Sequence, residues 1–163
     1  SSIIPMYAEN VVGMGKTMLG TLGIVRPLGM IGGTIITIYV GARFGRKTVV
    51  FVGFLVMALA LASFTLTKNP VGTFALFMLT GLAFGLPAPI LRTMVNDVST
   101  KGSRAAANGI YNALFAAGGG LGAAALAALV ELSYRASFYA AAIASIIAML
   151  ITISMRAPPP EHN

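Results

Sequence analysis

Cysteine and tryptophan are absent from the 163 residues, and histidine occurs once, as His162. Without cysteine the chain has no disulfide, no thiolate nucleophile and no cysteine-ligated metal site. The single histidine lies in the terminal segment, where the sequence offers no set of ligands that could complete a metal site with it. We therefore expect no metal site, no cofactor and no catalytic residue, which means that we do not expect an enzyme.

Charge is also scarce. Charged residues make up 9% of the chain and hydrophobic residues 57%, with a mean hydropathy of +0.88, whereas about 25% of the residues in a soluble domain are charged. The lysines and arginines give a net charge of +7 but lie singly or in threes, without the basic stripe of a nucleic-acid-binding protein. The composition predicts a protein whose solvent is the lipid bilayer.

Long apolar runs predict the architecture. A helix needs roughly 20 apolar residues to cross a bilayer, and five runs of about this length are separated by short polar connections. The expected spans are residues 18–42, 48–66, 71–91, 105–130 and 136–155. Residues 1–12 are apolar but too short to cross, so we expect a partial helix there and interpret the chain, which lacks an initiating methionine, as a fragment.

The predicted fold is therefore an all-α polytopic transmembrane helix bundle of five full spans and one partial span, over residues 1–157. Residues 158–163 begin with three prolines, which cannot continue a helix, and are expected to form a solvated tail.

The cations are unequally divided between the two sides of the predicted bundle, if Arg26, which falls inside a span, is left out. Three of them lie on one side: Lys16, Lys68 and Arg135. The other side has seven: Arg43, Arg46, Lys47, Arg92, Lys101, Arg104 and Arg156. Because cytoplasmic loops carry the excess of lysine and arginine, we expect the side with seven cations, and the C-terminus, to be cytoplasmic.

The loop between the first two full spans reads I-Y-V-G-A-R-F-G-R-K-T. It resembles the loop signature of the major facilitator superfamily, G-x-x-x-D-R-x-G-R-R/K, at four positions: Arg43, Gly45, Arg46 and Lys47. Ile38 and Ala42 depart from it, at the first glycine and at the aspartate. The glycine suits a tight turn between antiparallel helices. The cations suit either pairing with a carboxylate, for which Asp97 is the candidate, or simple anchoring at the cytoplasmic edge.

Two further stretches, residues 3–17 and 97–122, resemble the outer end of the family's seventh helix and its tenth-to-eleventh loop with the glycine-rich eleventh helix. The resemblance implies the C-terminal half of a transporter, from the end of helix 7 through helix 12. Its partner would be an N-terminal six-helix bundle of the same parent protein. It further implies alternating access to a central site, and a span at residues 71–91 that lines the cavity.

Four residues of that span, Thr80, Gly81, Gly85 and Pro87, are therefore candidates for cavity or gating positions. Pro87 and Pro89 each remove a backbone donor and should bend the helix. The bend serves either gating or static packing.

Arg26 is a further candidate, because a guanidinium inside a span usually faces the bundle interior or a carboxylate. Sixteen residues separate it from Ala42, about 24 Å of helix, so it also lies close enough to the outer boundary to snorkel. Asn108 and Asn112, four residues apart, suit either interhelical hydrogen bonds or contact with a solute.

The glycines at positions 118–120 and 122 are expected to let helices pack closely. No acid lies near the middle of a predicted span, so if transport is coupled to protons, the carboxylate that carries them is expected in the other half of the parent protein. The predicted function is transport of a small solute across the cytoplasmic (plasma) membrane. The alternative is a transporter-like membrane scaffold or assembly factor.

Overall fold

The computed structural model describes residues 3–100 and 102–154, which form helices and connecting turns without a strand. The helices are α1 (Ile3–Asn10), α2 (Lys16–Phe44), α3 (Arg46–Phe64), α4 (Pro70–Gly85), α5 (Pro87–Asp97), α6 (Arg104–Leu132) and α7 (Tyr134–Ser154). The all-α prediction is therefore confirmed. Met155 and Arg156, like Lys101 and the predicted tail, lie outside the described residues.

Five stretches are long and apolar enough to cross a membrane: Lys16–Gly41, Arg46–Phe64, Pro70–Asp97, Arg104–Leu132 and Tyr134–Thr152. The third of them consists of α4 and α5 in succession, and it runs beyond the expected end at Leu91 as far as Asp97. The chain is therefore a polytopic integral membrane protein.

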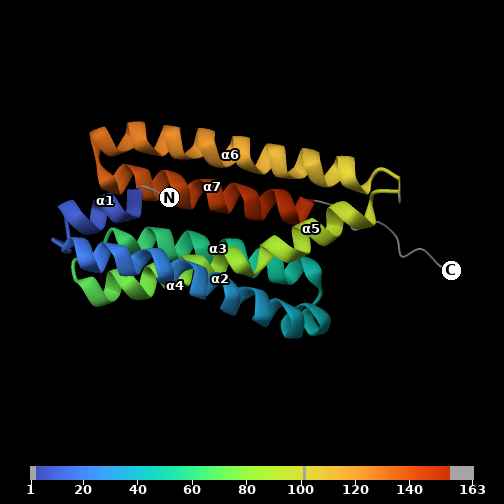
Figure 1. Ribbon diagram of the computed structural model, residues 1–163, viewed down its shortest axis with the longest axis horizontal. Helices are drawn as coiled ribbons and strands as arrows, with labels where there is room; N and C mark the ends of the chain where they lie inside the picture. Colours follow the sequence, from blue (N-terminus) through green and yellow to red (C-terminus); the bar gives the residue numbers. More distant parts are fainter. Residues whose placement is uncertain (1–2, 101, 155–163) are drawn as a thin grey trace.

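The helices lie roughly parallel or antiparallel, with α6 beside α7 along one edge and α2 beside α4 along the other (Figure 1). Between these pairs, α3 packs against both α7 and α4. At the end of the bundle that carries Arg46, α5 leads from α4 across to α6 (Figure 1). We call this the Arg46 end and the opposite one the Tyr134 end.

The α2–α4 contact is a reciprocal glycine seam, made by Gly29 and Gly33 of α2 with Gly81 and Gly85 of α4. A Cβ atom added to Gly81 would lie 2.2 Å from the carbonyl oxygen of Arg26, and one added to Gly29 would lie 2.2 Å from that of Met78. The other two glycines meet backbone carbonyl oxygens at 2.3 Å in the same way. Both helices thus approach backbone to backbone, as small residues at i and i+4 permit in membranes.

An aromatic cluster ties α1 to the bundle at the Tyr134 end. The hydroxyl oxygen of Tyr7 lies 3.0 Å from the carbonyl oxygen of Phe64 and 2.6 Å from that of Thr67. The Tyr7 ring meets that of Phe138 edge-on at 5.2 Å between centroids, and Phe138 stacks on Phe64 at 5.1 Å. Both phenylalanines are almost fully buried, so this cluster forms the best-packed part of the core.

In α6, by contrast, none of the residues is buried. A Cβ atom built on any of its glycines would meet nothing within 4 Å among the described residues. The expected close packing at Gly118, Gly119, Gly120 and Gly122 is therefore wrong for the described part of this chain. The physical reason is that α6 packs against α7 and α5 through residues other than these glycines.

Candidate functional site

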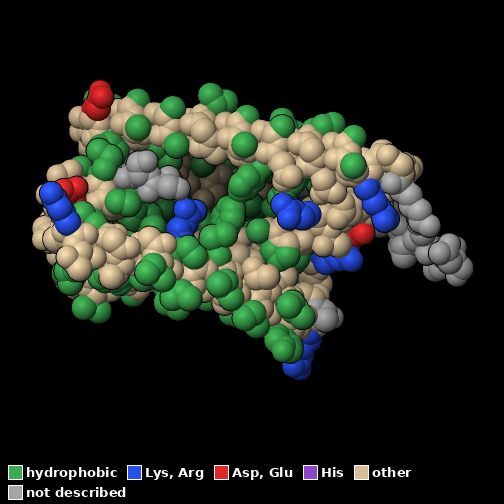
Figure 2. Space-filling model, viewed as in Figure 1, with side chains coloured by type: hydrophobic (Ala, Val, Ile, Leu, Met, Phe, Trp, Pro, Cys, Tyr) green, Lys and Arg blue, Asp and Glu red, His purple; other side chains and the backbone are tan. Residues whose placement is uncertain are grey.

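A cavity of about 850 Å³ opens where the Pro70–Asp97 span bends, between α5 and α6. It is lined by Thr34, Phe54, Phe84, Pro87, Ala88, Pro89, Leu91, Arg92, Thr93, Asn96, Tyr111, Asn112, Leu114 and Phe115. Figure 2 shows a hollow between the α6 edge and the α2–α4 edge, with lysine and arginine side chains beside it. The volume falls in the range of about 300–1,000 Å³ that suits small organic ligands.

Two prolines produce the bend above the cavity. Pro87 and Pro89 cannot donate a backbone hydrogen bond to the residues four positions earlier, and α4 therefore ends at Gly85 while α5 begins at Pro87. Leu86 itself keeps helical dihedral angles (φ −66°, ψ −56°), so the break is local. On α3, Gly53 makes room for the proline ring, because a Cβ there would lie 2.7 Å from Pro87 Cδ.

Hydroxyl groups of α2 contact the carbonyl oxygens at this bend. The Thr37 hydroxyl lies 2.9 Å from the carbonyl oxygen of Leu86, and the Thr34 hydroxyl lies 3.5 Å from that of Gly85. The latter oxygen would have accepted from residue 89 in an unbroken helix, but proline has no N–H there. Threonine hydroxyls on a neighbouring helix are a known means of satisfying such carbonyls inside a membrane.

An aromatic layer borders the cavity. Phe84 of α4 lies 5.8 Å from Phe115 of α6 between ring centroids, and Phe115 stacks on Tyr111 at 6.2 Å. On the far side of Phe84, the Arg26 guanidinium lies 5.8 Å from the ring centroid, within reach of a cation–π contact. The layer therefore joins α2, α4 and α6 through side-chain contacts.

The polar part of the cavity lies towards the Arg46 end. Arg92 of α5 donates to the amide oxygen of Asn112 on α6 at 3.4 Å. One turn further along, the Asn108 amide donates to the side-chain oxygen of Asn96 at 2.6 Å and to the carbonyl oxygen of Arg104 at 3.0 Å. These bonds hold α5 to α6 at one end, while the two helices stay apart at the cavity.

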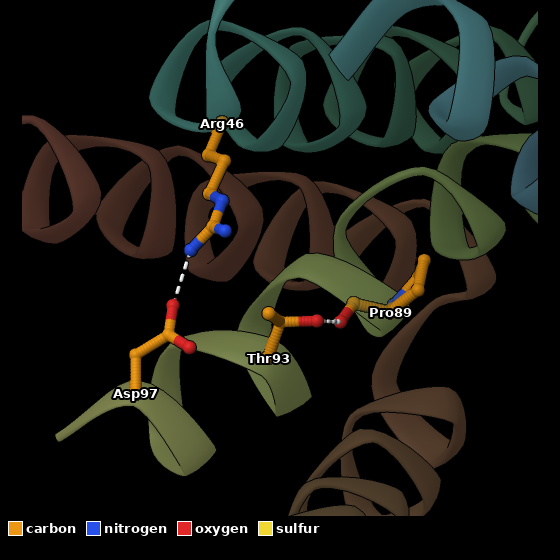
Figure 3. Close-up of polar contacts among 4 residues, drawn as sticks. All are labelled: Arg46, Pro89, Thr93 and Asp97. Carbon is orange, nitrogen blue, oxygen red and sulfur yellow. Dashed lines mark hydrogen bonds and ion pairs between the residues drawn. The ribbon is translucent and has the colours of Figure 1, made fainter. Parts of the chain in front are cut away.

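The loop after α2 turns at Gly45, whose φ of +83° favours glycine, and α3 begins at the next residue. From the first turn of α3, Arg46 reaches across to α5 and forms an ion pair with Asp97, as Figure 3 shows. Both side chains are about half exposed. The Arg43 guanidinium instead lies 5.9 Å from the ring of Phe44.

The chain thus combines five apolar spans with a bend in the third span. It also has a glycine turn, and the cation that follows this turn pairs with the third span. The sequence model of the Major Facilitator Superfamily matches residues 1–163. The chain belongs to the Major Facilitator Superfamily. Its members are membrane transporters, and secondary transport is their general activity. Neither a curated protein nor a solved structure gives a significant match.

Within this superfamily member, the residues singled out from the sequence lie in different places. Pro87 and Asn112 line the cavity. Gly81 and Gly85 belong to the glycine seam, and Thr80 is buried with its hydroxyl bonded to the carbonyl oxygen of Phe77 on its own helix at 2.7 Å.

Two other candidates lie next to the cavity rather than in its wall. Asn108 holds Asn96, and Arg26 contacts the Phe84 ring, so each touches a residue that does line it. The loop residue Lys47 follows Arg46 in the first turn of α3.

Several lining residues were missed by the sequence reasoning, chiefly Arg92, Tyr111 and Phe115. The charge count predicts only a cytoplasmic cation at Arg92, although this residue lies three residues after Pro89 on the bent span. Tyr111 and Phe115 repeat the four-residue spacing of Asn108 and Asn112 one position out of phase, so the pattern of α6 did carry a signal for an amphipathic face.

Proposed function

We propose that this chain is the C-terminal half of a transporter that moves a small solute across the cytoplasmic membrane by alternating access. Its partner is an N-terminal helix bundle of the same parent protein. The observation that carries the proposal is the cavity at the bend of the Pro70–Asp97 span, bordered by aromatic and amide side chains. Secondary transporters of this architecture hold their solute at the interface of two bundles, so we place this cavity on the face that the N-terminal bundle would cover.

The uncovered faces of α2 and α6 support the need for a second bundle. Gly20, Gly23 and Gly32 of α2, like the glycines of α6, have open space where a Cβ would point. A helix face rich in glycine is suited to close contact with another helix in a membrane. Figure 2 shows the hollow between the α6 edge and the α2–α4 edge, so a second bundle packed against both edges would close the site.

In the proposed orientation the Arg46 end faces the cytoplasm. Among the described cations, Arg43, Arg46 and Lys47 lie in or beside the loop at that end, in keeping with the excess of positive charge on cytoplasmic loops.

Because the chain has no cysteine, single cysteines introduced at Lys68 and Thr100 provide a test in a parent protein without other reactive cysteines. A membrane-impermeant maleimide applied to intact cells should label Lys68→Cys and not Thr100→Cys, and everted vesicles should reverse the pattern. Labelling of Thr100→Cys from outside would refute the orientation.

The transport test uses the full-length parent protein in proteoliposomes. Counterflow of organic anions and lipophilic cations is measured with and without a pH gradient, for the parent and for Arg26→Ala. We expect counterflow of at least one solute, and a reduced rate in the variant, since Arg26 holds the Phe84 ring at the cavity. Acceleration by the gradient would indicate proton coupling through a carboxylate of the N-terminal bundle.

Arg135→Ala is the matched control, because Arg135 is exposed at the start of α7, away from the cavity. A full-length protein that moves none of these solutes and copurifies with another membrane protein would contradict transport and favour a scaffold.

A further inference from the structure

The walls of the cavity carry charge of one sign. Arg92 is the charged residue among the described lining residues, and no aspartate or glutamate belongs to the lining. The nearest acid along α5 is Asp97, which is engaged by Arg46. A solute that enters this cavity therefore meets a guanidinium whose charge no carboxylate among the described lining residues neutralises.

The rest of the lining is aromatic on one side. Phe84, Phe115 and Tyr111 follow one another at ring-centroid distances of 5.8 Å and 6.2 Å. Such rings offer faces and edges to a further aromatic ring, a contact worth more than burial of the same area of aliphatic carbon. Arg26 already lies against Phe84, at the end of the layer away from Arg92.

The polar group and the aromatic layer are joined through α6. Asn112, whose amide oxygen accepts from Arg92 at 3.4 Å, directly follows Tyr111 and precedes Phe115 by three residues, and all three of these α6 residues line the cavity. An amide oxygen is a weak partner for a guanidinium compared with a carboxylate, which accepts two parallel N–H bonds. A ligand carboxylate can replace this contact with a stronger one.

We propose that the cavity binds an aromatic monocarboxylate, with its ring among Phe84, Tyr111 and Phe115 and its carboxylate on Arg92. This inference rests on the proposed function, whose solute site it specifies. Arg92 is here a binding residue, and Asn112 positions its guanidinium.

The experiment measures both binding and movement by the full-length parent protein. Equilibrium dialysis and proteoliposome counterflow are run with four probes of similar size: 1-naphthoate, the neutral naphthalene-1-carboxamide, the cation 1-naphthylmethylammonium and the aliphatic anion decanoate. We expect 1-naphthoate to be bound most tightly of the four. Tighter binding of the cation or the amide would overturn the anionic class, and equal binding of decanoate would overturn the aromatic requirement.

Variants of Arg92 then test where the carboxylate of the ligand binds. Arg92→Gln should weaken 1-naphthoate binding by roughly tenfold to a hundredfold, as expected for loss of a charge-assisted hydrogen bond, and Arg92→Lys should restore part of it. Arg92 is exposed, so neither change is expected to unfold the protein. Arg135→Gln is the matched control and should bind as the parent does. Equal binding by Arg92→Gln and the parent would overturn the proposal.

The two readouts separate this inference from transport itself. Arg92-dependent binding of 1-naphthoate without counterflow would support the ligand class and contradict the proposed transport. Counterflow of the cation or the amide without binding of 1-naphthoate would support transport and overturn the ligand class.

Discussion

Two glycine-rich regions of this chain differ in what surrounds them. In the α2–α4 seam, a methyl group on any of four glycines would collide with a carbonyl oxygen of the other helix at 2.2–2.3 Å. In α6, four glycines within five residues have open space around them. The difference shows that a glycine cluster in a membrane helix identifies a face capable of close approach, whereas its partner depends on the whole arrangement of helices.

The largest expected effect comes from adding a methyl group inside the glycine seam. Gly81→Ala puts a methyl group 2.2 Å from the carbonyl oxygen of Arg26, a backbone atom that cannot turn aside. We expect destabilisation of about 3 kcal/mol, the upper part of the usual range for overpacking. The measurement is the apparent melting temperature and the yield of monodisperse protein in detergent. Gly120→Ala is the matched control on α6. Equal losses of stability in both variants would contradict the difference between the two glycine regions.

A second change asks what covers the α6 glycines. Gly120→Leu in the full-length protein should abolish solute uptake, because the larger side chain keeps the second bundle from closing on α6. It should lower the melting temperature less than Gly81→Ala does, since a Cβ built at Gly120 meets nothing within 4 Å in the part of the chain that the structure describes. Uptake in proteoliposomes is compared with Ala144→Leu, an exposed position on α7. Full activity of Gly120→Leu would mean that the α6 face is left to lipid.

A smaller effect is expected where side chains, rather than glycines, join α2 to the bent span. Thr37→Val removes the hydroxyl that lies 2.9 Å from the carbonyl oxygen of Leu86, while it keeps the size of the side chain. The expected cost is about 0.6 kcal/mol and not more than about 1.7 kcal/mol. The Thr37 hydroxyl also lies 2.9 Å from the carbonyl oxygen of Gly33 in its own helix. Thermal unfolding of Thr37→Val is therefore compared with that of Thr21→Val, whose hydroxyl donates to the carbonyl oxygen of Met18 in its own helix. An undetectable difference would mean that the bend needs no donor from α2.

The smallest effect is expected at the Arg46 end. Arg46 and Asp97 are about half exposed, and exposed pairs contribute about 0.2–1 kcal/mol. A double-mutant cycle of Arg46→Gln and Asp97→Asn should give a coupling energy in this range that decreases as salt is added. A coupling above 2 kcal/mol would show that the loop is shielded from water in the complete protein.

The helical architecture could be read from the sequence because each span is a long apolar run, and a bilayer leaves such a run few alternatives to a helix. The bend was also foreseeable, since Pro87 and Pro89 must remove backbone donors wherever they stand. The partner of the loop could be narrowed to Asp97, because acids are so rare on that side of the chain.

The sequence could not distinguish the two glycine regions, because Gly29 and Gly33 are less conspicuous as a pattern than the consecutive Gly118, Gly119 and Gly120. Which face α2 turns to α4 depends on the mutual fit of both helices. The cavity was incompletely predicted for a similar reason. Arg92 and Phe115 line the same cavity only because of the direction in which the span bends and the angle at which α6 packs. Periodicity within one helix encodes neither the direction nor the angle.

The threonines of α2 also bear on how the protein is made. During synthesis α2 enters the bilayer before the proline-containing span, so the hydroxyls of Thr34 and Thr37 are present when the carbonyl oxygens of Gly85 and Leu86 leave the insertion machinery. The Gly85 carbonyl lacks its helical donor because residue 89 is proline, and a span with such a carbonyl is costly to release alone into hydrocarbon. Release of the bent span is thus expected to be delayed until it has docked on α2, which makes an earlier helix an intramolecular chaperone for a later one.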